Sequence, residues 1–478
     1  MTVNYTMLTD FYELTMANGY FEHGIGDREA CFDMFFRSVP DGGGFAIMAG
    51  VEQMITYLQN LRFSDEDIAY LRGKGCFSEA FLDYLAHFRF ACDVWAIPEG
   101  TPIFPSEPIV TVRGPILQAQ FVETMILLTI NHQSLIATKA CRICRAAGKS
   151  VVMEFGSRRA QGYDGAVLGA RASYIGGCAA TANAMADRDY GIPAAGTMAH
   201  SWVMTFDSEY EAFKAYAETY PGACTLLVDT YSVLKSGMPN AIRCFKEVLV
   251  PMGYRPQGVR IDSGDIAYLS KKMREMLDRA GFPDCKIVAS NALDEFIIKD
   301  LMTQGAPIDS FGVGERLITS RSEPVFGGVY KLSGIERDGV MQPKLKISEN
   351  VGKITNPAFK TVWRLYDCAS GRAIADVITL FDEVIDDTKP YLIFDPEHTW
   401  KRKLVTDFTA RRLPVQLFRK GELVYRSPDI HAIRDYCAAQ IETLWDEVLR
   451  FENPHIYYVD LSKKLWDIKQ ELLASHGE

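Results

Sequence analysis

The 478-residue sequence lacks the features of a secreted or membrane-spanning chain. Met1–Asp10 contain no basic region followed by an apolar run, so we expect no signal peptide. No apolar stretch approaches the roughly 18 residues that a membrane helix requires. We therefore expect a cytoplasmic protein that does not bind a membrane.

The sequence also lacks an excess of positive charge and a regular set of cysteines that would suggest disulfides. The formal net charge is −10, which disfavours non-specific binding to nucleic acid, although local arginines can still bind an anionic substrate. The 11 cysteines are scattered and odd in number, as expected of reduced intracellular thiols. Cys141 and Cys144 form a CxxC pair on a predicted helix, but there is no second pair. We interpret them as buried apolar thiols rather than a zinc or redox site.

Low-complexity tracts and flexible linkers are absent, and the middle of the chain instead carries a repeated pattern. Short apolar or β-branched runs are each followed by a polar or glycine-rich turn and usually by a helical stretch. The runs are Val151–Phe155, Gly177–Thr181, Pro193–Met198, Cys224–Val228, Val259–Asp262, Lys286–Ser290, Ser310–Val313 and Val329–Leu332. Such alternation predicts parallel strand pairing, and eight units predict an irregular (β/α) barrel. An open doubly wound sheet would show the same alternation, so the strand count distinguishes the two.

The two flanks do not show this alternation of strands and helices. The first mixes predicted helices with strand-like runs, at Asp10–Tyr20, Val51–Asn60, Asp65–Arg72, Cys31–Phe36 and Ile109–Val112. The last ends in two charged amphipathic stretches, Ile430–Phe451 and Leu461–Leu473. We predict an α/β protein in which residues 1–130 and 345–478 form one discontinuous α/β domain beside a barrel at 131–344.

Chemically reactive residues follow nearly every predicted strand of the middle region. In a parallel α/β barrel the active groups lie at the carboxyl ends of the strands. Those positions hold Arg158, His200, Asp229, Asp262, Ser290, Asn291, Gly312 and Gly314. This distribution predicts an enzyme. The GVG turn at 312–314 can bring backbone N–H groups close to a phosphate, although a simple tight turn is the alternative.

Arg260, Asp262 and His200 are the strongest individual candidates. Arg260 and Asp262 are two residues apart on a strand and point the same way, as a plain ion pair or as a clamp for an anionic substrate and magnesium-bound diphosphate. His200 is one of only 8 histidines and can act as a base or as a nucleophile toward a phosphoryl group. A lone histidine is more often structural. Asp229 can orient its second nitrogen or cap a helix, and Asp265 is expected to be a helix cap.

Taken in order, these segments resemble the nicotinate phosphoribosyltransferases, of the type II phosphoribosyltransferase family. The resemblance is carried by LTDFYELTM near the start, EFGSRRAQ at 154–161, ASYIGG at 172–177, GTMAHSW at 196–202, LVDTY at 227–231, VRIDSGD at 259–265, SNALDE at 290–295, FGVGE at 311–315 and GGVYKL at 327–332. It covers the N-terminus and the whole central region, and the C-terminal flank adds little.

The resemblance implies an irregular barrel plus a discontinuous α/β domain, and an enzyme that makes nicotinate mononucleotide and pyrophosphate from nicotinate and phosphoribosyl pyrophosphate. It implies Mg²⁺, coupled ATP hydrolysis through a phosphohistidine at His200 oriented by Asp229, and a homodimer with shared active sites. The implied substrate-binding residues are Tyr12, Phe155, Arg158, Thr197, Arg260, Asp262, Ser290, Asn291, Gly312 and Gly314. Tyr12, from the neighbouring subunit, and Phe155 would sandwich the pyridine ring. The ligands of the magnesium ion are left open.

Two positions depart from the family pattern. Glu315 stands where relatives often carry threonine, and we expect its carboxylate to turn away from a phosphate or to bind a cation. Ala182 stands where serine is common and where nicotinamide-using relatives carry an aspartate, which favours nicotinate. The alternatives are a nicotinamide phosphoribosyltransferase, a barrel lyase or isomerase acting on a phosphosugar, and an inactive homologue that senses nucleotides.

Overall fold

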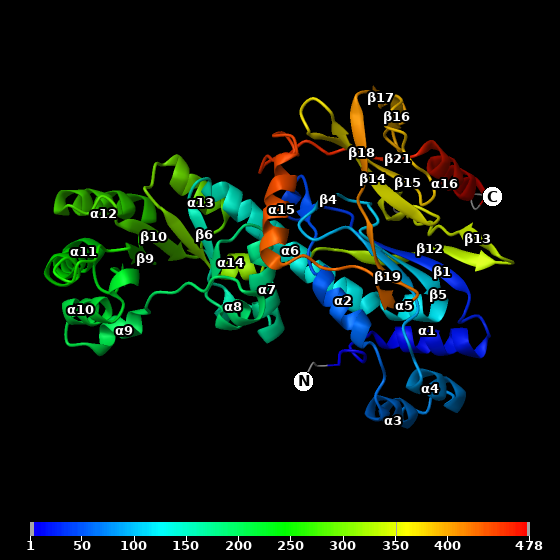
Figure 1. Cartoon of the computed structure of the whole chain (residues 1–478), viewed down its shortest axis with the longest axis horizontal. Helices are drawn as coiled ribbons and strands as arrows, with labels where there is room; N and C mark the ends of the chain where they lie inside the picture. The colour runs from blue at the N-terminus through cyan, green and yellow to red at the C-terminus, as the bar shows by residue number, and fades with distance from the viewer. Residues whose placement is uncertain (1–3, 350, 476–478) are drawn as a thin grey trace. The chain divides into compact units, whose positions relative to one another are not determined.

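The computed structural model describes residues 4–349 and 351–475 as a mixed α/β protein (Figure 1). The chain forms two compact units. The first joins residues 1–135 to 325–478, and the second contains residues 136–324. In the described part of the chain, no helix combines the length and the apolarity that crossing a membrane requires.

The first unit is built on a seven-stranded sheet to which both ends of the chain contribute. Its strand order is β13 (Val340–Pro343), β12 (Val329–Arg337), β1 (Glu29–Phe35), β5 (Val110–Pro115), β3 (Asp93–Ala96), β19 (Val415–Arg419) and β20 (Glu422–Leu423). Strand β1 is antiparallel to both β12 and β5. The prediction that Val329–Leu332 is the eighth barrel strand is therefore wrong. The residues of this run favour a strand, as predicted, but composition does not specify which strand it pairs with.

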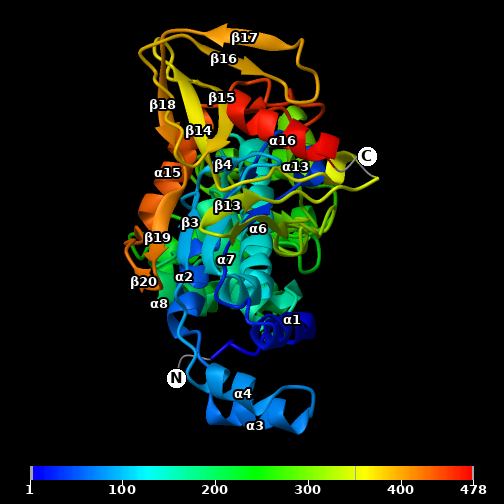
Figure 2. The same cartoon turned by 90° about the vertical axis from the view of Figure 1, so that its right-hand side faces the viewer.

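Smaller sheets and helices complete the first unit (Figure 2). A four-stranded sheet has the order β18 (Phe408–Arg412), β14 (Lys360–Asp367), β15 (Ala373–Leu380) and β21 (Val459–Leu461); β2 (Ala46–Ile47) pairs with β4 (Pro102–Ile103), and β16 (Tyr391–Phe394) with β17 (Arg402–Val405). The helices include α1 (Phe11–Glu22), α2 (Val51–Asn60), α3 (Asp65–Gly73), α4 (Glu79–Ala86), α15 (Ile430–Glu442) and α16 (Lys463–Ser475). The predicted flank helices are confirmed, except that α15 ends at Glu442 rather than near Phe451. Leu365, Val377 and Phe408 form a buried core between strands of the four-stranded sheet.

The second unit contains a parallel sheet of six strands. Their order is β7 (Ala180–Thr181), β6 (Val151–Glu154), β11 (Ser310–Val313), β10 (Lys286–Asn291), β9 (Gly258–Ile261) and β8 (Thr225–Leu227). The helices between and after them include α7 (Tyr163–Ile175), α8 (Ala184–Tyr190), α9 (His200–Thr205), α10 (Glu209–Thr219), α11 (Met238–Cys244), α12 (Ile266–Ala280), α13 (Glu295–Thr303) and α14 (Glu315–Ile318). Four consecutive buried residues in β10 are typical of a strand covered on both faces.

The predicted strand at Pro193–Met198 is not formed. This segment makes a single isolated parallel bridge, between Thr181 and Ala194. Pro193 has no backbone N–H to donate to a ladder, which disfavours a strand there. Among the described strands, β7 and β8 are edges that do not pair with each other, so the mixed α/β class is confirmed and a closed barrel is not shown.

Helix caps fix the turns at the carboxyl ends of β9 and β10. Asp265 accepts a 2.9 Å hydrogen bond from the Tyr268 N–H at the start of α12, as predicted. Asp294 accepts hydrogen bonds from the N–H groups of Phe296 and Ile297 at the start of α13. Each turn is thus closed within a few residues of its strand, and residues at the strand ends are presented along one edge of the sheet.

The CxxC pair lies on α6 (Glu123–Ala147) and forms no disulfide. Burial raises the pKa of the Cys141 thiol to about 12. The Cys144 sulfur lies 4.0 Å from the Cys178 sulfur, and none of the three cysteines is in a disulfide. The interpretation as a buried apolar thiol fits Cys141, whereas Cys144 is only partly buried.

Candidate active site

Arg260 is the centre of a hydrogen-bonded cluster at the carboxyl edge of the parallel sheet. Its Nε donates to the Ser290 hydroxyl at 2.9 Å, and its Nη1 donates to the Thr197 hydroxyl at 3.0 Å. The Ser290 hydroxyl in turn donates to Asp262 Oδ1 at 2.5 Å. Four predicted residues from three separate segments of the sequence therefore meet. They place a cation, a carboxylate and two hydroxyls in one site, as binding of an anionic, hydroxyl-bearing substrate requires.

His200, the first residue of α9, lies beside two carboxylates. Its Nε2 is 4.0 Å from Asp229 Oδ1 and 3.9 Å from Asp262 Oδ2, which is within electrostatic range but beyond a hydrogen bond. Its Nδ1 lies 3.2 Å from the Thr230 hydroxyl. Thr230 is thus the side chain that holds the ring by a hydrogen bond. Sequence reasoning missed Thr230, although it directly follows Asp229 at the end of a strand.

Asp229 connects the ends of β8 and β9 and does not cap a helix. Its Oδ2 accepts hydrogen bonds from the Asp262 N–H at 2.9 Å and the Ser263 hydroxyl at 2.6 Å. Its Oδ1 is buried and has no hydrogen-bond partner among the described residues.

The glycines of the GVG turn make room for Phe155. A β-carbon on Gly312 would lie 2.4 Å from Phe155 Cδ2, and one on Gly314 would lie 3.1 Å from the Phe155 carbonyl oxygen. The Arg260 guanidinium carbon is 6.0 Å from the centre of the Phe155 ring. The turn therefore positions an aromatic ring as well as offering backbone N–H groups, and the first of these roles is not visible in the sequence.

Asn291 is the last residue of β10, and Glu315 is the first residue of α14, which follows β11. Asn291 has a backbone φ of +145°, which residues other than glycine adopt only under strain. Such strain is frequent at functional sites. Its own side chain accepts a 2.6 Å hydrogen bond from the Ala292 N–H. Glu315 forms an ion pair with Arg321 at 3.1 Å, so its carboxylate has a cation of the chain itself as partner.

Two predicted residues are not joined to this cluster. Arg158 lies in the turn Ser157–Arg159 after β6 and is exposed to solvent. Tyr12 lies on α1 of the first unit, where partial burial and the neighbouring carboxylates Glu123 and Glu13 raise the pKa of its hydroxyl. Because Tyr12 and Phe155 belong to different units, the pairing of their rings stays a prediction.

The donor set at the strand ends fits a magnesium ion that is held mainly by substrate. No group of at least three histidine, cysteine or acidic side chains in residues 4–349 and 351–475 is arranged as a metal site. Magnesium at phosphate sites usually takes only one or two protein carboxylates, together with water and phosphate oxygens. The unpartnered Oδ1 of Asp229 and the partly exposed Asp262 fit that requirement.

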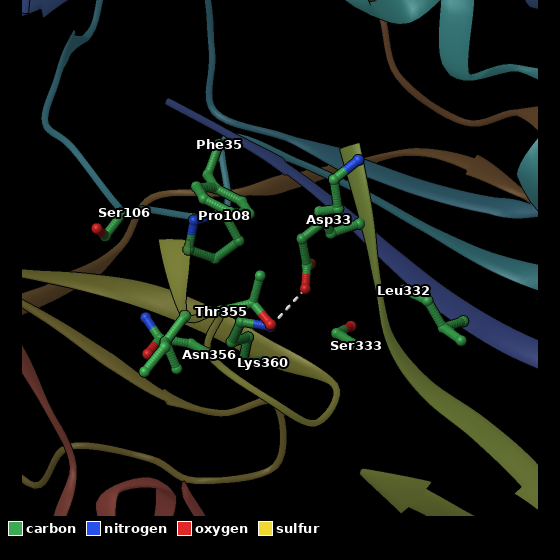
Figure 3. Close-up of a pocket in the computed structure, with 11 residues that line it drawn as sticks. Asp33, Phe35, Ser106, Pro108, Leu332, Ser333, Thr355, Asn356 and Lys360 are labelled. Carbon is green, nitrogen blue, oxygen red and sulfur yellow. Dashed lines mark hydrogen bonds and ion pairs between the residues drawn. The ribbon is translucent and has the colours of Figure 1, made fainter. Parts of the chain in front are cut away.

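A separate small pocket in the first unit contains none of the predicted residues (Figure 3). Its lining includes Asp33, Ser333, Thr355 and Lys360. Lys360 and Asp33 are almost completely buried and form an ion pair with each other. Their charges compensate one another, so we interpret this pocket as part of the packing of the seven-stranded sheet.

Comparison with known proteins decides the family. Three sequence-family models match consecutive parts of the chain: the nicotinate phosphoribosyltransferase N-terminal domain at residues 7–131, the nicotinate phosphoribosyltransferase family at 151–360, and the C-terminal domain at 359–469. The nicotinate phosphoribosyltransferase of Bacillus subtilis is 45% identical over 97% of this chain and 94% of its own length. This chain belongs to the nicotinate phosphoribosyltransferase family.

Further matches agree with this assignment. The nicotinate phosphoribosyltransferase of Homo sapiens is 31% identical over 98% of this chain and 97% of its own length. The crystal structure of human nicotinic acid phosphoribosyltransferase superposes with a TM-score of 0.87 at 30% identity, covering 97% of this chain and 99% of that one. The resemblance predicted from the sequence is confirmed, and so is the mixed α/β class.

Proposed function

We propose that this protein is a nicotinate phosphoribosyltransferase of NAD biosynthesis. It would transfer the phosphoribosyl group of phosphoribosyl pyrophosphate to the ring nitrogen of nicotinate, with release of pyrophosphate. The observation that carries the proposal is 45% identity to the Bacillus subtilis enzyme over 97% of the chain. The cluster around Arg260 supports it with suitable chemistry.

Nicotinate is flat and anionic, and Phe155 and Arg260 suit both properties. The aromatic ring offers a stacking face, and the guanidinium offers charge and an N–H group for the carboxylate. Arg260 already donates to Ser290 and Thr197, so its position is fixed before substrate binds. Fixed donors cost little reorganisation when charge develops.

In the transfer step the pyridine nitrogen forms a bond to the ribose C1′ while the bond from C1′ to pyrophosphate breaks. The ribose carries positive charge in the transition state, and the carboxylates of Asp262 and Asp229 would stabilise it. Asp262 and Asp229 would also hold Mg²⁺, which when bound neutralises charge on the leaving pyrophosphate. Arg158, exposed on the loop after β6, would contact the diphosphate.

The 5′-phosphate would bind between the loops after β10 and β11. Ser290 pairs in register with Gly312, and Asn291 with Val313, so these loops begin side by side. Hydroxyl, amide and backbone N–H groups of Ser290, Asn291, Gly312 and Gly314 would form a neutral cradle for the phosphate.

We propose His200 as the residue through which ATP hydrolysis is coupled. Its ring nitrogen would form a bond to the γ-phosphorus of ATP as the bond to ADP breaks, and water would later cleave the phosphohistidine. Asp229 and Asp262 would stabilise the charged imidazole, and Thr230 would fix its plane. About 2.7 kcal/mol of coupling would change substrate affinity 100-fold.

Ala182 supports nicotinate over nicotinamide. It lies between Thr181, which donates to the buried Glu154 at 2.6 Å, and Asn183, which donates to Ser157 at 3.1 Å. The Ala182 side chain offers no carboxylate at the position where nicotinamide-using relatives carry one, so an acid substrate would meet no repulsion from that residue. A nicotinamide phosphoribosyltransferase is the second candidate.

We also propose an irregular barrel in which Pro193–Met198 lies between the edge strands β7 and β8. The bridge from Thr181 to Ala194 and the 3.3 Å hydrogen bond from Arg260 Nη1 to the Met198 carbonyl support this.

The two compact units support the discontinuous domain, with divisions after residues 135 and 324 rather than 130 and 344. We further propose a homodimer in which Tyr12 serves the neighbouring site. We also propose a cytoplasmic location, which fits cysteines that form no disulfide in the described structure.

The deciding experiment supplies the purified protein with phosphoribosyl pyrophosphate, Mg²⁺ and either nicotinate or nicotinamide, with and without ATP. Formation of nicotinate mononucleotide and pyrophosphate, accelerated by ATP, is expected. Turnover of nicotinamide alone would move the assignment to the second candidate. No turnover with either substrate would overturn the proposed function.

A further inference from the structure

The proposed cradle for the 5′-phosphate lacks positive charge, because its side chains are a serine, an asparagine and glycines. A phosphate dianion in a protein site is usually matched by a cation. We propose that Arg316 supplies this charge and that Asp294 holds its guanidinium in place. The inference rests on the proposed function and assigns a further substrate-binding residue to the same site.

Arg316 lies where the loops after β10 and β11 meet. It is the second residue of α14, two positions after Gly314. Its Nη1 donates to Asp294 Oδ2, and Asp294 is the cap of α13, three positions after Asn291. Since β10 and β11 are hydrogen-bonded neighbours, the ion pair ties the two halves of the proposed cradle together.

The guanidinium has a donor to spare. Arg316 Nε is buried and has no hydrogen-bond partner among the described residues. A buried N–H without an acceptor is energetically unfavourable, and a ligand oxygen would supply the missing acceptor. The Asp294 carboxylate accepts hydrogen bonds from Arg316 and from the N–H groups of Phe296 and Ile297, and these donors offset part of its negative charge.

The other cations of this region are committed elsewhere. Arg260 donates to Ser290, Thr197 and the Met198 carbonyl. Lys139 and Arg142 form a buried ion cluster with Glu295 at 2.8 and 3.0 Å. Arg321 pairs with Glu315. Arg316 also pairs with a carboxylate, that of Asp294, but its ion pair joins the segment after β10 to the segment after β11.

The test compares two ligands that differ only in the 5′-phosphate. Calorimetry measures the dissociation constants of nicotinate mononucleotide and of its dephosphorylated nucleoside, for the wild type and for Arg316→Met. We expect the mononucleotide to bind about 10- to 100-fold more weakly to the variant, as for loss of a charged hydrogen bond, and the nucleoside to bind unchanged. Equal weakening of both ligands, or no weakening of either, would overturn the proposal.

Two further variants separate binding from folding. Asp294→Asn keeps a helix-capping side chain but loses the ion pair, and we expect about 3- to 10-fold weaker binding of the mononucleotide alone. Arg255→Met is the matched control: Arg255 pairs with Asp284 at 3.0 Å on the loops that precede β9 and β10, at the opposite ends of those strands. It should leave both dissociation constants unchanged. A similar phosphate-specific loss in Arg255→Met would also overturn the proposal.

Failure of the proposed function can be told apart from failure of this inference. Ribose 5-phosphate and ribose serve as a second pair of probes that do not depend on nicotinate. If the wild type shows no transferase activity but binds ribose 5-phosphate in an Arg316-dependent way, the function fails and the phosphate site stands. If the wild type is active and Arg316→Met leaves its KM for phosphoribosyl pyrophosphate unchanged, the inference alone fails.

Discussion

Arg260 Nε donates to the Ser290 hydroxyl at 2.9 Å, across the gap between the neighbouring strands β9 and β10. This bond fixes the Arg260 guanidinium at the edge where the parallel strands end. Only 16% of the Arg260 side chain is exposed. The same arginine reaches Thr197 on the irregular segment before His200. One side chain thus aligns three segments that are far apart in the sequence.

Arg260→Lys should lose this alignment even though it keeps the charge. An ammonium on a flexible chain cannot donate in the fixed directions of a guanidinium to Ser290 and Thr197 together. We expect kcat/KM for nicotinate to fall about 100-fold, as for loss of two hydrogen bonds to a charged group. Steady-state kinetics with nicotinate as the varied substrate measures this. An unchanged kcat/KM would show that Arg260 is only structural.

His200→Ala should abolish the stimulation by ATP and leave slow, ATP-independent transfer. The substitution removes the proposed phosphate acceptor but none of the groups proposed to bind nicotinate. Initial rates with and without ATP measure the effect, together with acid-labile phosphate on the protein. If ATP still stimulates the variant fully, His200 is not the acceptor.

Thr230→Val should weaken the coupling without abolishing it. The variant loses the hydrogen bond to His200 Nδ1, and one such bond contributes about 0.5–1.5 kcal/mol, or about 3- to 10-fold. We expect a loss of that size in the rate of histidine phosphorylation and a smaller effect on ATP-independent transfer. Thr230→Ser is the control and should restore phosphorylation, because it keeps the hydroxyl. Equal rates in the valine and serine variants would contradict this role.

Gly312→Ala should displace the Phe155 ring, since the new methyl group would lie 2.4 Å from its Cδ2 atom. Overpacking of this kind typically costs about 1–3 kcal/mol of stability. We expect a lower free energy of unfolding and a raised KM for nicotinate. Gly222→Ala, also in the second unit, is the control, because its nearest neighbour would be 3.8 Å away. A normal KM in Gly312→Ala would argue against a role of Phe155 in binding.

Glu13 should make stability depend on pH. Burial raises the pKa of its carboxyl from 4.5 to about 7, although hydrogen bonds from Thr124 and Thr9 oppose the shift. Because the folded state favours the protonated form, this stabilisation is complete below pH 4.5 and is lost as the pH rises to 7. Relative to Glu13→Gln, the wild type should lose about 3 kcal/mol between pH 4.5 and 7.

Chemical denaturation of both proteins at pH 5 and pH 8 measures this difference. The exposed substitution Glu66→Gln, on α3 of the same unit, serves as the control and should show no such trend. A wild-type advantage over Glu13→Gln that grows with pH would have the wrong sign and would exclude a raised pKa for Glu13.

The sequence by itself determined the order of most strands and helices in the second unit, the cap at Asp265 and the residues that gather at the strand ends. These features depend on local properties: apolar runs, capping side chains and residue type at each turn. It also determined the family, because ordered motifs along the chain are a property of the sequence alone.

Only the tertiary structure decided which partner each strand takes and which residues touch in the site. Val329–Leu332 is a strand as predicted but pairs antiparallel with β1, and Pro193–Met198 has apolar residues but forms only a bridge. The hydrogen bond of Thr230 to His200 and the contact of Gly312 with Phe155 join segments far apart in the chain. Their energies come from long-range packing and hydrogen bonding, which no local pattern of residues encodes.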